Sequence, residues 1–224
     1  MPKKDAVGID LGLRELAAFS DPALETILAQ RFYRDLEPAL AIAQRAGKKD
    51  RIKAIHAKIA NRRKDHLHKL STSLVKGYGV VVVGNVSSSK LIKTKMAKSV
   101  LDSGWSTFKT QLMNKSHWAA SVFKEVNESF STQDCSACGT RAGPKGQKDL
   151  KVERWTCPCC GIEHDRNRNA AVNILVKGLL VIEKEKAVNR EEKSCEALTN
   201  KDSGAISAVA GPGLRPLVAG IPDL

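Results

Sequence analysis

The chain has 224 residues, of which 42% are hydrophobic and 4% aromatic, enough for one core of good size and a small additional module. Lysine and arginine number 37 against 24 acidic residues, and the net charge of +13 predicts a polyanionic partner, most simply nucleic acid. No apolar run has the length of a membrane span and no signal peptide precedes the first strand-like segment, so we expect a cytoplasmic protein without a membrane partner.

The first predicted strand ends in an acid between two glycines. Residues 6–12 read AVGIDLG, and the apolar segment at residues 13–20 is a predicted hairpin partner. Asp10, at the end of such a strand, is well placed to hold a divalent metal against a phosphate. The alternative is an ordinary turn aspartate, because the pattern Gly-x-Asp-x-Gly arises often by chance.

A strongly basic helical segment is predicted at residues 36–76, where apolar residues recur at three- to four-residue spacing. Between Lys48 and Lys76 ten basic residues stand against only Asp50 and Asp65. Such a charge run is often a solvated face, but the imbalance of sign favours a helix that faces phosphates. The residues expected to bind nucleic acid are Lys48, Lys49, Arg51, Lys58, Arg62, Arg63 and Lys64.

A run of four valines predicts the most buried strand of the chain. It lies within residues 78–86 (YGVVVVGNV), and its lack of alternation is typical of a strand covered on both faces, as in a parallel or mixed sheet. A helix is predicted from about Ser99 to Ala120. A strand follows over residues 122–128 (VFKEVNE).

Two Cys-x-x-Cys pairs predict a metal site. Each pair is followed by a glycine, Gly139 or Gly161, as tight turns require, and the spacer lets the chain return to complete a tetrahedron. Disulfides or inert thiols are the alternative, although nothing indicates a secreted protein. We therefore expect a ribbon over residues 131–163 that binds structural zinc through Cys135, Cys138, Cys157 and Cys160.

The segment after the ribbon leads into a last predicted helix. Residues 164–175 read HDRNRNAAVNIL, and the helix is expected from about Asn169 to Glu183. Beyond Lys184 the periodicity is lost. We therefore expect residues 184–224 to form a mobile tail.

This order of motifs resembles the C-terminal half of TnpB, the transposon-encoded RNA-guided nucleases (the OrfB-type transposase family) related to type V CRISPR effectors. The resemblance covers about residues 5–180. The matching pieces are GIDLG at residues 8–12, RRKDHL at 62–67, STQDCSACG at 131–139, CPCCG at 157–161 and HDRNRNAAVNIL at 164–175.

The resemblance implies an α/β fold, an RNase H-like (RuvC) domain with an inserted four-cysteine zinc ribbon. The nuclease core would occupy residues 5–130, with the basic helical segment at about 36–76. The ribbon would occupy residues 131–163, and the last RuvC motif and its helix residues 164–183. The implied activity is metal-dependent cleavage of DNA directed by a guide RNA.

The resemblance also implies three carboxylates that hold magnesium or manganese, and this chain departs from that pattern. Asp10 matches the first. The family's second acid is a glutamate where this chain has Gly84, so Glu128, at the end of the next strand, is either its replacement or an exposed strand-end acid. The family's third acid falls on Asn167, and the retained Asp165 is either a substitute or a helix-terminal acid.

We therefore expect Asp10, Glu128 and Asp165 to face the metal, with weakened cleavage. One alternative is a nuclease-dead, guided DNA-binding repressor, because Gly84 and Asn167 replace acids. Another is a truncated transposon fragment, because the family carries an N-terminal half ahead of the first catalytic strand. If the chain is not such a fragment, we expect that half to be encoded separately and to act as a partner. The other expected partners are DNA and a guide RNA.

Overall fold

The computed structural model of the chain divides into two units, residues 1–182 and residues 183–224. The first unit contains a central sheet, its helices and the cysteine-rich ribbon. In the second unit the described residues continue the last helix. The described backbone covers residues 3–86, 97–145, 149 and 151–202, with side chains described as far as residue 190.

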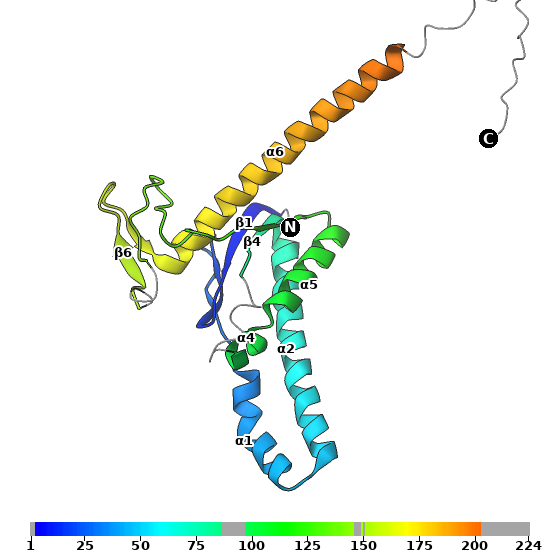
Figure 1. Cartoon of the computed structure of the whole chain (residues 1–224), viewed down its shortest axis with the longest axis vertical. Helices are drawn as coiled ribbons and strands as arrows, with labels where there is room; N and C mark the ends of the chain where they lie inside the picture. The colour runs from blue at the N-terminus through cyan, green and yellow to red at the C-terminus, as the bar shows by residue number, and fades with distance from the viewer. Residues whose placement is uncertain (1–2, 87–96, 146–148, 150, 203–224) are drawn as a thin grey trace, which may run out of the picture. The chain divides into compact units, whose positions relative to one another are not determined.

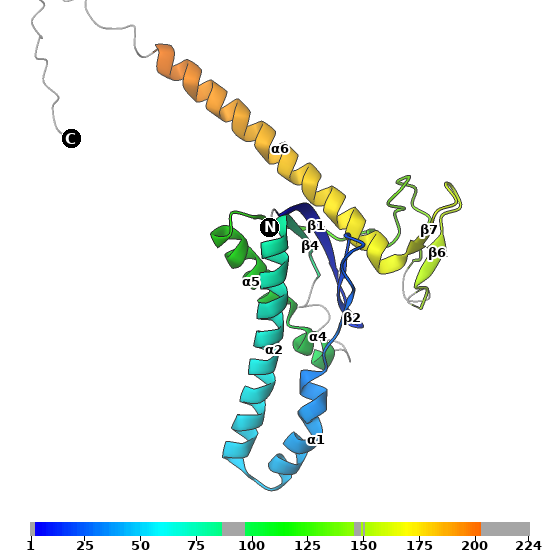
Figure 2. The ribbon, with the colours of Figure 1, turned by 180° about the vertical axis from the view of Figure 1, so that it is seen from behind.

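A five-stranded mixed sheet in the order β3-β2-β1-β4-β5 forms the centre of the first unit (Figures 1 and 2). β1 and β2 pair antiparallel, as predicted, and β2 and β3 also pair antiparallel. β4 and β5 add to β1 in parallel. The carboxyl ends of β1, β4 and β5 therefore meet at one edge of the sheet. The strands are β1 (Lys4–Leu11), β2 (Glu15–Phe19), β3 (Ile27–Leu28), β4 (Tyr78–Gly84) and β5 (Val122–Val126).

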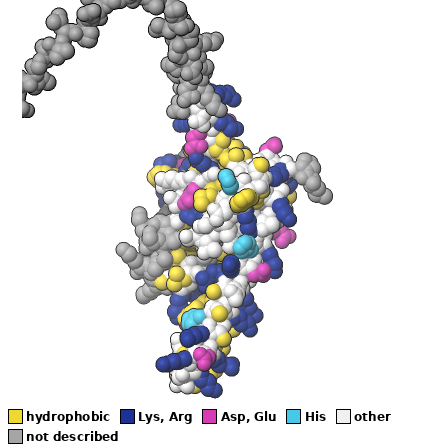
Figure 3. All heavy atoms as spheres, turned by 90° about the vertical axis from the view of Figure 1, so that its right-hand side faces the viewer, with side chains coloured by type: hydrophobic (Ala, Val, Ile, Leu, Met, Phe, Trp, Pro, Cys, Tyr) yellow, Lys and Arg dark blue, Asp and Glu magenta, His cyan; other side chains and the backbone are white. Residues whose placement is uncertain are grey.

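Two antiparallel helices take the place of the single basic helical segment expected from the sequence. α1 (Phe32–Arg45) and α2 (Lys49–Gly77) are joined by a turn at Gly47, whose φ of +63° favours glycine. Lys and Arg side chains cover much of this hairpin (Figure 3). The helix expected from about Ser99 to Ala120 is also two helices, α4 (Ala97–Ser103) and α5 (Trp105–Trp118).

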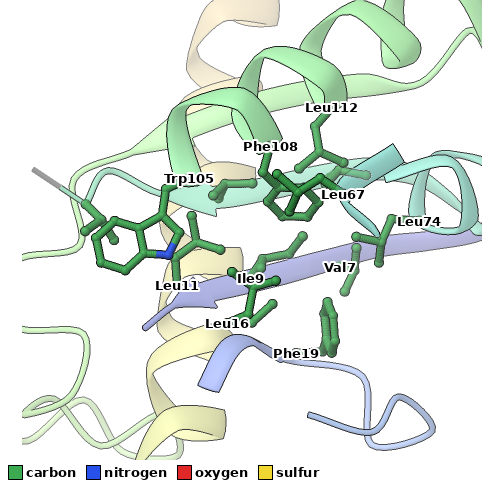
Figure 4. Close-up of a cluster of buried hydrophobic side chains, with 14 of the residues drawn as sticks. Val7, Ile9, Leu11, Leu16, Phe19, Leu67, Leu74, Trp105, Phe108 and Leu112 are labelled. Carbon is green, nitrogen blue, oxygen red and sulfur yellow. The ribbon is translucent and has the colours of Figure 1, made fainter. Parts of the chain in front are cut away.

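The main hydrophobic core lies between the sheet and helices α2 and α5. Val7 and Ile9 of β1 have no exposed surface and point toward Leu67 and Phe108, which are equally buried (Figure 4). Gly104, between α4 and α5, has φ +63°, and a Cβ there would lie 3.0 Å from Leu67 Cδ1. The break between the two helices therefore allows the chain to pass close to α2.

Helix α6 (Arg166–Asp202) covers the other face of the sheet with its first part. A Cβ on Gly8 of β1 would collide with the carbonyl oxygen of Ala171, and one on Gly178 would collide with the side chain of Val82. The two glycines therefore let the helix and the sheet approach at backbone distance. A small cluster of Val82, Val126 and Ile174 fills the rest of this contact.

Helix α6 is longer than the sequence pattern suggested. It continues to Asp202, whereas a helix end near Glu183 and a mobile tail over 184–224 were expected. Residues 184–202 lack apolar periodicity but are rich in Glu, Lys and Ala, which favour helix without packing. Residues 203–224 of the expected tail lie outside the described residues. None of the described helices is both long and apolar enough to cross a membrane.

Candidate functional site

The four predicted cysteines converge. The Sγ atoms of Cys135, Cys138, Cys157 and Cys160 all lie within 4.8 Å of one another. Cys135 Sγ is 3.7 Å from Cys160 Sγ, and Cys138 Sγ is 3.7 Å from Cys157 Sγ. A tetrahedral site with Zn–S bonds of about 2.3 Å has sulfur–sulfur edges of about 3.8 Å. The donor set and its spacing therefore fit a metal ion of the size and preference of zinc.

Both cysteine pairs lie on turns of the same form. The amide of Gly139 donates to the carbonyl of Cys135, and the amide of Gly161 donates to that of Cys157, each at 2.8 Å. The φ angles of the two glycines are +77° and +72°. No atom would obstruct a Cβ at either position, so the left-handed backbone conformation is what requires glycine here. The second pair is flanked by strands β6 (Arg154–Thr156) and β7 (Glu163–Asp165), which pair antiparallel.

A histidine that the sequence analysis did not single out contacts the thiol cluster. His164 is 8% exposed, and its Nε2 lies 3.0 Å from Cys135 Sγ. Its ring packs on Trp155, with centroids 4.8 Å apart. An Nε2–H would donate to a thiolate at this position and reduce its charge. The available sequence signal was a histidine shortly after the second cysteine pair.

Two asparagines attach the first cysteine turn to helix α6. The Asn169 side chain accepts a hydrogen bond from Ser136 N at 2.9 Å and donates to the carbonyls of Ser131 and Asp134 at 3.2 and 2.8 Å. Asn173 donates to the same two carbonyls at 2.8 and 2.7 Å. The metal site and the start of α6 are therefore joined through one buried polar network.

Asp10 lies at the carboxyl end of β1, partly buried, on the sheet face that α6 covers. Its pKa is raised to about 7, chiefly by burial and next by the negative charge of Glu128. Arg166 opposes this rise, and Glu15 adds to it. Burial also raises the pKa of Glu128, which nearby lysines oppose. Glu128 thus lies close enough to Asp10 to disfavour the charged form of Asp10.

The side chain of Glu128 occupies the space that a side chain at position 84 would need. A Cβ built on Gly84 would lie 2.9 Å from Ile174 Cδ1, 3.1 Å from Glu128 Oε2 and 3.3 Å from Glu128 Cβ, so Glu128 and Ile174 share this space. This follows from the register, because Gly84 pairs with Val126 and the amide of Asn85 donates to the carbonyl of Val126 at 2.7 Å. Glu128, two residues past the end of β5, therefore places its side chain beside the end of β4.

Asp165 is placed differently from the other two predicted acids. It is exposed, and its Oδ1 accepts a hydrogen bond from Arg168 N at 2.9 Å, the geometry of an N-cap on α6. Among the described residues, only the four thiols form a set of three or more ligand atoms within 4.8 Å of one another. The carboxylates of Asp10, Glu128 and Asp165 are spaced more widely. The role of Asp165 in binding a metal stays a prediction.

The basic residues of α2 are mostly free to meet a polyanion. All seven predicted residues except Arg63 are exposed. Arg63 is half-buried, with its guanidinium 3.5 Å from Asp102, a buried acid that also accepts the amide hydrogen of Tyr33. Its charge is therefore engaged within the fold, whereas Lys48, Lys49, Arg51, Lys58, Arg62 and Lys64 lie on the surface.

Two family models match the chain. Residues 1–95 match the model described as "Probable transposase", and residues 105–174 match the "Cas12f1-like, TNB domain". A "Putative RNA-guided DNA endonuclease" of Streptomyces pristinaespiralis is 37% identical over 188 residues, covering 78% of this chain and 45% of the relative. The TnpB-like protein L79 of Acanthamoeba polyphaga mimivirus is 27% identical over 203 residues, covering 79% of this chain and 38% of the relative.

Two solved structures share the fold. A cryo-EM structure of a Cas12f1–sgRNA–target DNA complex has a TM-score of 0.56 at 18% identity, covering 75% of this chain and 49% of that one. A CRISPR-Cas12f ternary complex has a TM-score of 0.57 at 18% identity, covering 78% and 40%. At this identity the likeness shows an α/β fold resembling Cas12f and nothing further. The chain spans about half the length of the curated relatives it matches. The matched models and relatives show that the chain belongs to the TnpB-like family of OrfB-type transposases.

Proposed function

We propose that the chain is a TnpB-like nucleic-acid-binding protein with an RNase H-like (RuvC) core that cleaves DNA in a metal-dependent, RNA-guided manner, at a reduced rate. The observation that carries this proposal is the side chain of Glu128, which fills the space beside Gly84 and lies close to Asp10. The sheet supports the fold assignment, because Asp10 lies near the carboxyl end of β1, the central strand. β1 pairs antiparallel with β2 on one side, and β4 and β5 follow in parallel on the other.

The pair of acids fits a divalent cation. Carboxylate oxygens are the ligands that magnesium and manganese prefer. Burial raises the pKa of both Asp10 and Glu128, so keeping both charged without a cation is unfavourable, and a bound cation would offset that cost. When bound, such ions supply an activated water and stabilise the leaving oxygen of a phosphodiester. Asp10 and Glu128 would hold them at the carboxyl edge of the sheet.

The reduced rate follows from the start of α6. Asp165 caps the helix, which leaves its carboxylate turned to a backbone amide. Asn167 is neutral and cannot replace the charge of an acid. Arg166 lowers the pKa of Asp10, so a positive charge lies near the acids as well. If these features abolish cleavage altogether, the chain is a guided DNA-binding repressor, the second candidate function.

The partners in this proposal are DNA and a guide RNA, which the exposed lysines and arginines of α2 would contact through phosphates. The four thiols would hold structural zinc, and the ribbon would depend on it for its fold.

Purified protein tested with RNA from the flanking locus, matched DNA and magnesium or manganese would decide between these functions. We expect slow cleavage that disappears in Asp10→Ala and Glu128→Ala and persists in Glu163→Ala, an exposed ribbon acid. Guided binding without cleavage in the unchanged protein would instead support the repressor. Absence of RNA-dependent binding would refute both functions.

A further inference from the structure

A cavity of about 360 Å³ lies between the start of α1 and the middle of α2. Its volume falls within the range of pockets that bind small organic groups. Among the described residues of its wall, Phe32 alone is hydrophobic. The others are Gln30, Asp35, Arg62, Asp65, His66 and Lys69. An apolar side chain of a partner protein would leave most of these polar groups without a partner, so the wall suits an occupant that has polar edges.

Two aromatic rings meet in this wall. Phe32 is the first residue of α1, and the centroid of its ring lies 5.8 Å from that of His66, with the two planes tilted by 60°. Both side chains are half-buried, and Phe32 lies outside the main hydrophobic core. Burial lowers the pKa of His66, so its ring is mostly uncharged at neutral pH. The pair therefore offers aromatic surface to a planar occupant.

His66 also has an unused hydrogen-bonding group. Its Nε2 is shielded from solvent and has no hydrogen-bond partner among the described residues. Leaving a buried polar atom unpaired is unfavourable. Because the His66 side chain is part of the cavity wall, an occupant that carries donors and acceptors on its edge would supply the missing partner.

Two cations border the same cavity on the exposed surface of α2. Arg62 forms no ion pair with any of the described residues. Lys69 pairs with Asp65 at 2.7 Å, and both ends of this pair are mostly exposed. A pair of this kind contributes little in water, so Lys69 can exchange its partner for a phosphate. The cavity therefore combines an aromatic surface with cations suited to an anion.

A second cavity, of about 420 Å³, follows along the same helix. It is lined by His68, Lys69, Thr72, Ser73 and Lys76, so Lys69 belongs to the walls of both cavities. Arg62 in the first cavity and Lys76 in the second lie about 21 Å apart along the helix, at 1.5 Å per residue. The two cavities together suit a chain of several nucleotides better than a single small molecule.

We infer that the cavity between α1 and α2 binds an unpaired base of a single-stranded nucleic acid. The base stacks against Phe32 and His66, and Arg62 and Lys69 contact the flanking phosphates. A duplex does not fit this site, because the faces of its bases are stacked on one another. The inference rests on the proposed function, in which α2 contacts nucleic acid through phosphates, and adds a base site to that surface.

Fluorescence anisotropy with the purified chain tests this inference without requiring cleavage. Three labelled single strands of equal length are compared: RNA, DNA, and a DNA in which every nucleotide lacks its base. The third strand keeps the phosphates, so the difference in affinity isolates the contacts to bases. We expect RNA, DNA or both to bind about tenfold more tightly than the abasic strand, and the tighter of the two identifies the source of the base.

Single substitutions locate the contact. Phe32→Leu keeps the apolar bulk but removes the ring, and we expect it to weaken binding of the base-bearing strand about tenfold while binding of the abasic strand is unchanged. Phe32→Tyr keeps the ring and should keep the affinity. Arg62→Gln should weaken binding of all three strands alike and reduce the salt dependence by about one phosphate contact. Phe130→Ala, which removes an exposed ring after β5, is the matched control and should bind as the unchanged protein does.

The outcomes that would overturn the inference are distinguishable from failure of the proposed function. If the abasic strand binds as tightly as the base-bearing strands, or if Phe32→Leu keeps the difference between them, the cavity is not a base site and phosphate binding by α2 stands. If the unchanged protein binds none of the three strands, nucleic-acid binding itself fails and the base site fails with it. Thermal melting of each variant verifies that its fold is intact.

Discussion

Replacing the two asparagines of α6 one at a time should give unequal losses of stability. Asn169→Ala leaves the amide of Ser136 without its acceptor and removes one of two donors from each shared carbonyl. An unpaired buried donor costs about 1–3 kcal/mol and each lost hydrogen bond about 1 kcal/mol, so we expect a loss of about 3 kcal/mol in the free energy of unfolding. Asn173→Ala leaves both carbonyls paired with Asn169, so we expect its free energy of unfolding to fall by only about 1 kcal/mol.

Urea unfolding of the zinc-loaded proteins measures this difference directly. A gap of about 2 kcal/mol corresponds to melting temperatures about 4–8 °C apart for a chain of this size. Asn169→Ala should also release zinc faster to a chromogenic chelator, because the first cysteine turn loses its attachment to α6. Equal losses in Asn169→Ala and Asn173→Ala, or a loss below about 0.5 kcal/mol in the first, would refute this account of the network.

Three further predictions concern single positions. His164→Ala should speed zinc release about 10–100-fold, because the contact of His164 with Cys135 is lost. An unchanged release rate would show that His164 does not support the metal site. Gly84→Glu should destabilise the protein by about 1–3 kcal/mol in urea through overpacking against Ile174 and Glu128. Adding Glu128→Ala to this variant should recover part of the loss, and no recovery would contradict the shared space. Hydrogen bonds from Lys4 and Tyr78 hold the pKa of Asp21 well below its usual range. The charged Asp21 therefore contributes fully to stability above about pH 4, and this contribution is lost as the pH falls further. Asp21→Asn should make the free energy of unfolding depend less on pH below about pH 4.

The features predictable from sequence were those set by local spacing. The cysteine pairs and their glycines specify two turns within a few residues each, and the four thiols do converge. Two neighbouring apolar segments predicted the hairpin around Asp10, and a run without alternation predicted the valine strand. Both are present. Patterns of this kind depend on short segments of chain, so little tertiary information is needed to interpret them.

The features that escaped prediction depend on contacts between distant segments. The breaks at Gly47 and Gly104 fall within continuous helical patterns, and periodicity does not report where a helix turns back. The contact between Glu15 and Asn167 requires the placement of α6 on the sheet. Helix α6 continues beyond its last core-facing residues because the residues that follow favour helix. Amphipathic periodicity does not reveal such an extension.

The shared space between β4 and β5 has an evolutionary consequence. Gly84 ends β4 and Glu128 lies two residues past the end of the neighbouring strand β5, and a Cβ at position 84 would crowd the Glu128 side chain. An acid can therefore be exchanged between the end of β4 and the segment after β5 while staying in the same region of the sheet edge. Chains with glutamate at both positions would pass through an overcrowded intermediate, so the favoured route loses the acid on β4 before gaining it after β5. Related sequences should accordingly carry one acid or the other, and rarely both.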